Sequence, residues 1–389
     1  MKKMDSKVYQ KVVDFTRELY HTPEKPIYLH EPLFIGRDRE YVLDAIDSTF
    51  VSSIGKYVDR FEDMMGDITG GNRGVALMNG TAALHIALKL VGVQQDDEVI
   101  CQPLTFIATA NAISYERAIP HFVDVDEDTL SLSPDALLQR LKDVAIVRGE
   151  ECYNKITGRR ISACVPMHTF GHPARIEQIV EVCDSYHIPV IEDAAESLGS
   201  YRNNQHTGTF GLVGTFSFNG NKTVTSGGGG ALITKDPALR ERAKYITTTA
   251  KIPHRWEYRH SEIGYNYRMP NLNAALACAQ LELLDQHVKN KRTTAAAYQD
   301  FFREIDGVNS IPEPSDSQSN YWLNAIRLPD RASRDAFLEF TNDAGVITRP
   351  IWTLMNHLTM FADCPAGDLS VAEVLESQVV NMPSSVRHA

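Results

Sequence analysis

The sequence predicts an α/β protein with a mostly parallel sheet in a large domain and a small α+β domain at the C-terminal end. From about residue 73, short apolar runs alternate with runs of helical spacing, and several of the short runs are apolar throughout. Such alternation is typical of parallel sheets covered by helices, and uniformly apolar strands are buried on both faces. After Gly264 the alternation stops and long helical spacing follows, which predicts the second domain.

Each element follows from its local pattern. Apolar, β-prone runs between turn-forming residues predict strands over 75–78, 98–104, 119–125, 161–168, 190–191 and 213–218. Helical spacing predicts helices over 81–90, 107–115, 133–141 and 176–186, and later over 272–288 and 294–305. A strand over 322–328 and mixed helix and strand over 332–352 complete the pattern. We therefore expect an N-terminal helical segment (1–28), a large domain (29–270) and a small domain (271–389).

The composition is that of an acidic, enzyme-sized chain. Its 389 residues can bury a large core, and a net charge of −11 without a basic block argues against nucleic acid or an acidic membrane surface as the main partner. No apolar run reaches the length of a membrane span and the N-terminus has no apolar signal core, so a cytoplasmic location is expected. The six cysteines contain no C-x-x-C pair. Four of them lie in apolar runs, which favours reduced packing residues: Cys101, Cys164, Cys183 and Cys278. The other two are Cys152 and Cys364.

Three predicted strand ends carry candidate binding residues, because ligands gather at the carboxyl ends of strands in open α/β sheets. Gly80 and Thr81 at a helix start offer a seat for phosphate, with plain helix capping as the alternative. Phe106 is placed to cover a planar ring or to join the core. Asp193 follows an apolar strand and would be costly to bury without a cation. A protonated pyridine nitrogen would serve, as would a structural salt bridge.

One lysine, Lys222, stands between the strand 213–218 and four consecutive glycines at 227–230. The strand fixes one side of it, and the glycines permit close approach of backbone or ligand on the other. This placement suits an amine that attacks a bound aldehyde or ketone. The alternative is a surface lysine at a hairpin tip.

No metal or dinucleotide site is predicted. His168 and His172 are four residues apart, but the intervening Phe170-Gly171 and the following Pro173 break any helix that would align them. Alternating aspartates at 124, 126 and 128 resemble a calcium loop that lacks its required glycine. Neither G-x-G-x-x-G nor G-x-x-x-x-G-K-[ST] occurs.

In their order along the chain, these motifs resemble the DegT/DnrJ/EryC1/StrS family of fold-type-I pyridoxal phosphate enzymes, mostly aminotransferases of nucleotide-linked keto sugars. The likeness runs from about Leu29 to the C-terminus, through Asn79-Gly80-Thr81, Thr105-Phe106, Glu192-Asp193-Ala194-Ala195, Ser217-Phe218 with Lys222, the glycine run, and Gly264-Tyr265-Asn266-Tyr267-Arg268. The stretches 29–32, 50–58 and 268–275 look closest to the subgroup that makes legionaminic acid and related 4-amino-4,6-dideoxy sugars.

The resemblance implies pyridoxal 5′-phosphate as cofactor and a role for each matching residue. Lys222 matches the Schiff-base lysine that also shuttles the substrate proton, and Asp193 the carboxylate that keeps the pyridine nitrogen protonated. Phe106 matches the aromatic ring stacked on the cofactor. Gly80, Thr81 and Ser217 match phosphate ligands, and Asn266 matches a phosphate ligand from the neighbouring subunit, which implies a homodimer with shared active sites.

Two positions depart from the family pattern. Glu196 stands where many relatives have Gln or His beside the phenolic oxygen of the cofactor, so this carboxyl must be protonated or share a proton. Gly228 replaces an acidic residue that is common in the glycine run. The lysine position itself is intact, whereas dehydratase relatives carry His there.

The function that the resemblance implies is transfer of an amino group from glutamate to the 4-keto group of a UDP- or GDP-linked 4-keto-6-deoxy (2-acetamido) hexose. The alternatives are 3-amination of a dTDP-linked keto sugar and a non-catalytic regulatory role. For the substrate, Tyr57, His168, His254 and Arg255 are candidates. The last two lie in a segment, 251–260, that mixes cations with aromatics and suits a pyrophosphate, although it also reads as an ordinary charged loop.

Overall fold

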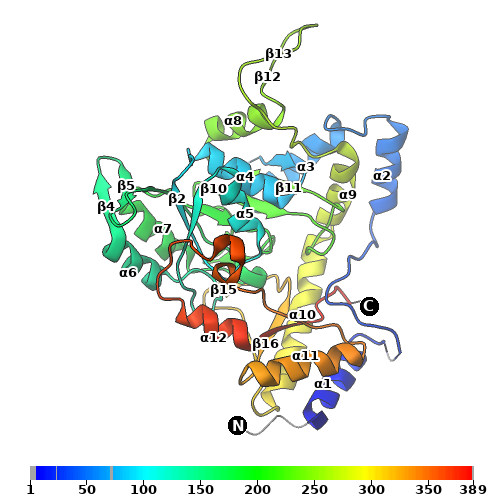
Figure 1. Cartoon of the computed structure of the whole chain (residues 1–389). Coiled ribbons are helices and arrows are strands. Elements are labelled where there is room, and N and C mark those ends of the chain that lie inside the picture. Colours follow the sequence, from blue (N-terminus) through cyan, green and yellow to red (C-terminus); the bar gives the residue numbers. More distant parts are fainter. Residues whose placement is uncertain (1–5, 23, 71–72, 388–389) are drawn as a thin grey trace.

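A computed structural model describes residues 6–22, 24–70 and 73–387, and Figure 1 shows the arrangement of its elements. The centre is a sheet in two hydrogen-bonded groups. The first group has the order β1 (Val75–Leu77), β11 (Gly230–Ile233), β10 (Val213–Ser217), β7 (Ile191–Asp193). The second contains β3 (Ile119–Phe122), β2 (Glu98–Cys101) and β6 (Arg160–Val165), extended by the hairpin of β5 (Glu151–Asn154) and β4 (Ala145–Arg148). Parallel bridges from Cys164 to Val190 and from Met167 to Asp193 join the groups.

The predicted parallel sheet is confirmed at its centre, with two antiparallel parts, strand β11 and the hairpin of β4 and β5 at the edge. The pairs β10/β7, β2/β6 and β2/β3 are parallel, whereas β11 runs antiparallel to both β1 and β10. The pattern did not predict β11, since this strand begins on the last glycine of the glycine run and glycine is depleted in strands. As a result, β10 and β11 are neighbouring strands whose connection carries Lys222.

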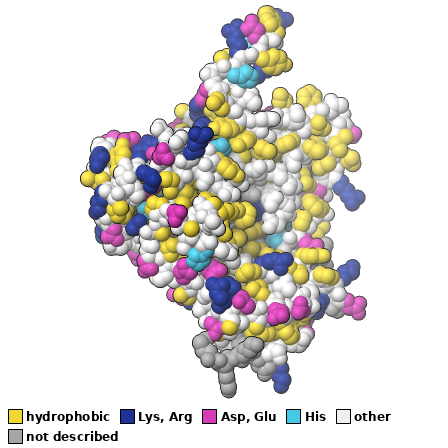
Figure 2. All heavy atoms as spheres, in the orientation of Figure 1, with side chains coloured by type: hydrophobic (Ala, Val, Ile, Leu, Met, Phe, Trp, Pro, Cys, Tyr) yellow, Lys and Arg dark blue, Asp and Glu magenta, His cyan; other side chains and the backbone are white. Residues whose placement is uncertain are grey.

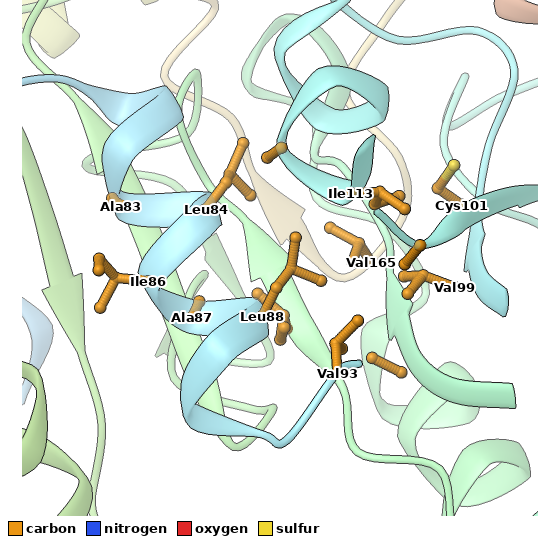
Figure 3. Close-up of a cluster of buried hydrophobic side chains, with 14 of the residues drawn as sticks. Ala83, Leu84, Ile86, Ala87, Leu88, Val93, Val99, Cys101, Ile113 and Val165 are labelled. Atoms are coloured by element: carbon orange, nitrogen blue, oxygen red, sulfur yellow. The ribbon is translucent and has the colours of Figure 1, made fainter. Parts of the chain in front are cut away.

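The predicted helices of the large domain are present as α4 (Gly80–Leu90), α5 (Ala108–Tyr115), α6 (Pro134–Val144) and α7 (Ile176–Asp184). Helix α4 is buried along almost its whole length, as expected for a helix that is apolar on all sides. In Figure 3, Leu84 and Leu88 of α4 point toward Val99 of β2 and Val165 of β6. This core fixes the start of α4 beside the sheet.

Two further helices, α2 (Asp38–Asp47) and α3 (Lys56–Thr69), pack against α9 (Asn271–Leu281). The predicted break between 288 and 294 is wrong, because α10 runs unbroken over Leu284–Arg303 and the interruption falls at Glu282 and Leu283. The inward face of α10 includes the polar residues His287, Lys291 and Thr294. Their polarity interrupts the apolar period in the sequence, although the helix continues.

The C-terminal part has its own antiparallel sheet in the order β14 (Asn309–Ser310), β16 (Asn324–Arg327), β18 (Val379–Met382), β17 (Arg349–Pro350). Its helices are α11 (Arg331–Asp343) and α12 (Ser370–Gln378), and the N-terminal α1 (Ser6–Leu19) packs on α11. The remaining elements are β8 (Tyr201–Arg202), β9 (Gln205–His206), α8 (Pro237–Thr247), β12 (Lys251–Ile252), β13 (Arg259–His260), β15 (Ser317–Gln318), and the short 3₁₀ helices Thr169–Gly171, Met355–His357 and Thr359–Phe361. None of the helices in the described ranges is long and apolar enough to cross a membrane. The domain boundaries at 28 and 270 stay predictions.

Candidate active site

A cavity of about 620 Å³ lies at the carboxyl ends of β7 and β10, beside the start of α4. Strand ends and a helix start meet here because α4 packs directly against β10 and β11. The cavity brings together seven of the eight predicted cofactor residues, namely Gly80, Thr81, Phe106, Asp193, Glu196, Ser217 and Lys222. The eighth, Asn266, does not line it.

The first turn of α4 forms one wall of the cavity. Asn79 caps the helix by accepting a hydrogen bond from the Ala82 N–H at 2.7 Å. Helix capping and a phosphate seat are therefore compatible here, because a cap satisfies only some of the free N–H groups of a first turn. Ser217, at the end of β10, comes so close that a Cβ on Gly80 would lie 2.9 Å from the Ser217 Cβ. The glycine thus allows the Ser217 and Thr81 hydroxyls and the helix N-terminus to face one space, which suits a phosphate.

Asp193 is 3% exposed, at the end of β7. Its Oδ2 accepts a hydrogen bond from the Thr109 hydroxyl at 2.7 Å, and its Oδ1 accepts one from the Ala195 N–H at 3.2 Å. Burial raises the pKa of this carboxyl, and the Thr109 hydroxyl and Ala195 N–H oppose that rise. Both donors are neutral, so the carboxylate can still pair with a cation inside the cavity, as a protonated ring nitrogen requires.

Lys222 points into the cavity, and its side chain is only 13% exposed. The surface-lysine alternative is therefore wrong. The Lys222 Nζ lies 3.2 Å from Glu196 Oε1 and 3.8 Å from the centre of the Trp322 ring. The amine is thus held between a carboxyl of the large domain and an aromatic face that precedes β16.

Glu196 is buried beneath this amine. Its Oε2 accepts a hydrogen bond from the Phe170 N–H at 2.9 Å. Burial raises the pKa of Glu196 to about 7, against the opposing effect of the nearby Lys222. A carboxyl in this range can exchange a proton with a neighbouring amine near neutral pH. The sequence prediction that Glu196 must be protonated or share a proton agrees with this environment.

The cavity also contains residues that the sequence reasoning missed. Arg349 of β17 and Trp322 both line it, and Thr109 supports it through Asp193. Arg349 and Trp322 lie a hundred or more residues beyond Lys222 and follow no glycine or aspartate signal. Thr109 had a signal, because it lies one helical turn after Thr105, at the same predicted strand end as Phe106.

Two of the predicted substrate residues lie outside this cavity and are already paired. Tyr57 is buried in α3, where its ring contacts that of Tyr41 at 5.3 Å. His168 is fully buried; its Nε2 lies 2.9 Å from Glu192 Oε2, and its Nδ1 accepts a hydrogen bond from Ala174 N–H. A place for His168 in the wall of the sugar pocket is therefore wrong for this cavity, since both of its ring nitrogens serve the large-domain core.

The other two, His254 and Arg255, lie in the connection between β12 and β13. This hairpin projects from the body of the molecule, and Figure 2 shows hydrophobic, basic and histidine side chains along it. His254, Arg255 and the 69% exposed Trp256 do not line the cavity of their own chain. Asn266 follows the hairpin and bridges to Thr248. A contribution of these residues to a neighbouring subunit stays a prediction.

The comparison with known proteins fits this geometry. Residues 34–388 match the model of the DegT/DnrJ/EryC1/StrS aminotransferase family. The chain belongs to this family. It is 38% identical to the "putative pyridoxal phosphate-dependent aminotransferase EpsN" of Bacillus subtilis (strain 168) over 87% of this chain and 84% of the relative. It is 35% identical to the "GDP-perosamine synthase" of Escherichia coli O157:H7, over 92% and 93%.

A solved structure, that of the aminotransferase TlmJ from Streptoalloteichus hindustanus, has a TM-score of 0.84 at 26% identity, and the match covers 92% of this chain and 93% of that one. The fold is thus that of the fold-type-I family, as predicted from the resemblance. The chain is an aminotransferase of this class with pyridoxal phosphate as cofactor, rather than a non-catalytic relative.

Proposed function

We propose that the chain transfers the amino group of glutamate to the 4-keto carbon of a nucleotide-linked 4-keto-6-deoxy (2-acetamido) hexose. The observation that carries the proposal is the amine of Lys222 in one cavity with a buried carboxylate, Asp193, and a helix N-terminus at Gly80. Likeness to sugar aminotransferases supports the substrate class, and likeness to a GDP-perosamine synthase favours GDP as the nucleotide. The closer likeness to the legionaminic-acid subgroup remains part of the proposal.

In this proposal the bound cofactor supplies an electron sink for the carbon that loses its proton. Asp193 would hold a positive charge on the ring nitrogen, and Phe106, half-exposed in the same cavity, would pack on the ring. The start of α4, with Thr81 and Ser217, would hold the phosphate. Lys222 takes the proton from the donor carbon and returns it to the acceptor carbon. The Glu196 Oε1, 3.2 Å from the Lys222 Nζ, accepts a proton from this amine or donates one to it.

The overall reaction needs no other reagent. Glutamate loses its amino group and becomes 2-oxoglutarate, and the keto sugar gains that group in place of its oxygen. Both ligands are anionic, the donor through its carboxylates and the acceptor through its diphosphate. Arg349 provides a cation in the same cavity, and a guanidinium is suited to bidentate binding of a carboxylate or phosphate.

The homodimer and the cytoplasmic location belong to the same proposal. The hairpin that carries or adjoins Asn266, His254 and Arg255 projects from its own subunit. We therefore expect these residues to complete the cavity of a partner subunit. Sedimentation of the purified chain tests this assembly: a dimer is expected, and mixing two inactive variants, Lys222→Ala and Asn266→Ala, should restore part of the activity if sites are shared. A monomer with full activity would contradict the shared site.

The catalytic assignment is tested with Lys222→Ala. Pyridoxal phosphate added to the wild type should give a visible absorbance band that changes on addition of glutamate, and the variant should lack both while keeping its far-ultraviolet circular dichroism. Turnover at the wild-type rate in this variant would end the assignment. A panel of GDP-, UDP- and dTDP-linked keto sugars with glutamate as donor then identifies the acceptor, and a preference for dTDP-linked sugars with amination at C3 would favour the alternative substrate.

A further inference from the structure

A short segment before β16 contacts both loops that carry the reactive side chains. The side-chain Nδ2 of Asn320 donates hydrogen bonds to the Glu196 and Leu198 carbonyls, each at 2.8 Å. The same Nδ2 lies 3.4 Å from the Thr223 hydroxyl, one residue after Lys222. Asn320 is fully buried. One amide therefore links the loop of Glu196 to the loop of Lys222.

Trp322, two residues later, holds the Lys222 loop at two points. Its indole Nε1 donates a hydrogen bond to the Asn221 carbonyl at 2.6 Å, and its ring faces the Lys222 Nζ at 3.8 Å. The first contact fixes the backbone beside the lysine, and the second acts on the amine itself. A lysine side chain has about 2 kcal/mol of rotamer entropy to lose, so contacts at its tip decide how long the amine faces the cavity.

The segment that presents these two side chains is itself tightly fixed. Tyr321, between them, has a φ of 47°, which is unfavourable for an aromatic residue and persists only where the surroundings enforce it. The Asn320 Oδ1 accepts a hydrogen bond from the Trp322 N–H at 2.8 Å. That oxygen lies against Gly171, where a Cβ would stand 1.9 Å from it. Behind Trp322, the buried amine of Lys291 donates to the Trp322 carbonyl at 3.1 Å.

We propose that Asn320 and Trp322 are positioning residues that hold the Lys222 amine against Glu196 in the orientation needed to join the cofactor. The inference rests on the proposed function, since it takes Lys222 as the reactive amine. In the joining step the amine nitrogen adds to the aldehyde carbon of pyridoxal phosphate, and the aldehyde oxygen leaves as water when the C=N bond forms. An amine held by these contacts reaches that geometry more often than a free one. Asn320 and Trp322, together called the clasp below, therefore accelerate the step.

The test measures this step apart from turnover. Pyridoxal 5′-phosphate is added to cofactor-free full-length protein, and the growth of the visible band is followed by stopped-flow absorbance. Trp322→Leu removes both contacts to the lysine loop and should slow the band by up to about 30-fold, the factor that corresponds to about 2 kcal/mol of lysine rotamer entropy. Trp322→Phe keeps an aromatic face and should recover most of the rate. Asn320→Ser perturbs the other half of the clasp and should also slow it, which keeps the test valid if Trp322→Leu does not fold.

Binding of pyridoxamine 5′-phosphate is the matched control, because this compound fits the same cavity but cannot join a lysine. Its dissociation constant should change by less than about 2-fold in both slow variants, whereas a general collapse of the cavity would weaken it in parallel with the rate. Equal rates in wild type, Trp322→Leu and Asn320→Ser would overturn the clasp, as would a parallel loss of pyridoxamine phosphate affinity. If the wild type itself forms no band, the proposed function fails instead.

Discussion

The hydrogen bond from Thr109 to Asp193 gives a prediction whose size follows from the geometry. The Thr109 hydroxyl donates to the Asp193 carboxylate at 2.7 Å, and both side chains are buried. Thr109→Val keeps the side-chain shape and deletes this donor. A buried hydrogen bond to a charged acceptor contributes about 1.5 to 3 kcal/mol, so we expect the variant to lose about that much stability at pH 8.

The pH dependence of the loss identifies its cause. Burial already raises the pKa of Asp193, and the Thr109 hydroxyl opposes that rise, so removing the hydroxyl raises the pKa further. A carboxyl with a raised folded-state pKa costs stability once the pH rises above its unfolded pKa, and the full cost is present above the folded pKa. The difference between wild type and Thr109→Val should therefore be largest at pH 8 and shrink toward pH 4.

Urea denaturation of cofactor-free protein at pH 8 and at pH 4 to 5 measures this difference. Thr109→Ser is the matched control, since it keeps the hydroxyl and deletes only a methyl group; its cost of about 1 kcal/mol should not depend on pH. A Thr109→Val loss that is equal at both pH values, or no greater than that of Thr109→Ser at pH 8, would refute the reasoning.

Three further predictions concern the same region. Gly80→Ala places a Cβ 2.9 Å from the Ser217 Cβ and should cost about 1 to 3 kcal/mol and weaken pyridoxal phosphate binding, whereas Gly220→Ala, with open space around its Cβ, should do neither; equilibrium dialysis compares the two. Glu196→Gln removes a carboxyl whose burial raises its pKa from 4.5 to about 7. Because the folded state holds that proton more tightly, the wild type loses stability as the pH rises from 4.5 to about 7. Over that range the variant should gain about 1 to 3 kcal/mol relative to the wild type in denaturant titrations. Lys291→Met removes an amine whose burial lowers its pKa from 10.5 to about 7. Because the unfolded chain binds that proton more tightly, the stability of the wild type rises between pH 7 and 10. The difference in stability between wild type and variant should therefore shift in favour of the wild type across that range, as measured by thermal melts.

The sequence predicted the large-domain half of the site because that half follows a general rule. Gly80, Asp193 and Ser217 stand at strand ends or a helix start, and the carboxyl ends of neighbouring parallel strands meet at one edge. The exposure of Lys222 was undecidable from composition, since its burial depends on Trp322 and on the small domain behind it. Pattern reasoning has no access to such contacts between segments a hundred residues apart.

The parts of the fold that were missed have a similar origin. Strand β11 begins on a glycine, and α10 buries His287 and Lys291 on its inner face. In both cases contacts with the rest of the fold stabilise a residue that is locally unfavourable there, a glycine in a strand or a polar side chain on the buried face of a helix. Lys291 shows how: its amine lies 2.9 Å from His30 Nε2 and donates to the Trp322 carbonyl. Because these acceptors satisfy the buried amine, α10 continues through Lys291, although a lysine at this position interrupts the apolar periodicity of the sequence.

Asp193 and Glu196 lie three residues apart and are both buried, yet their surroundings differ in a way that separates their roles. The donors to Asp193 are a threonine hydroxyl and a backbone N–H, which are fixed and neutral. Glu196 has one backbone donor, from Phe170, and one partner that can move and exchange a proton, the amine of Lys222. Of two carboxyls with different surroundings, one can serve as a fixed anion and the other as a proton donor and acceptor. We infer that Asp193 serves to hold a cation in the cavity, while Glu196, 3.2 Å from the Lys222 amine, serves in proton transfer.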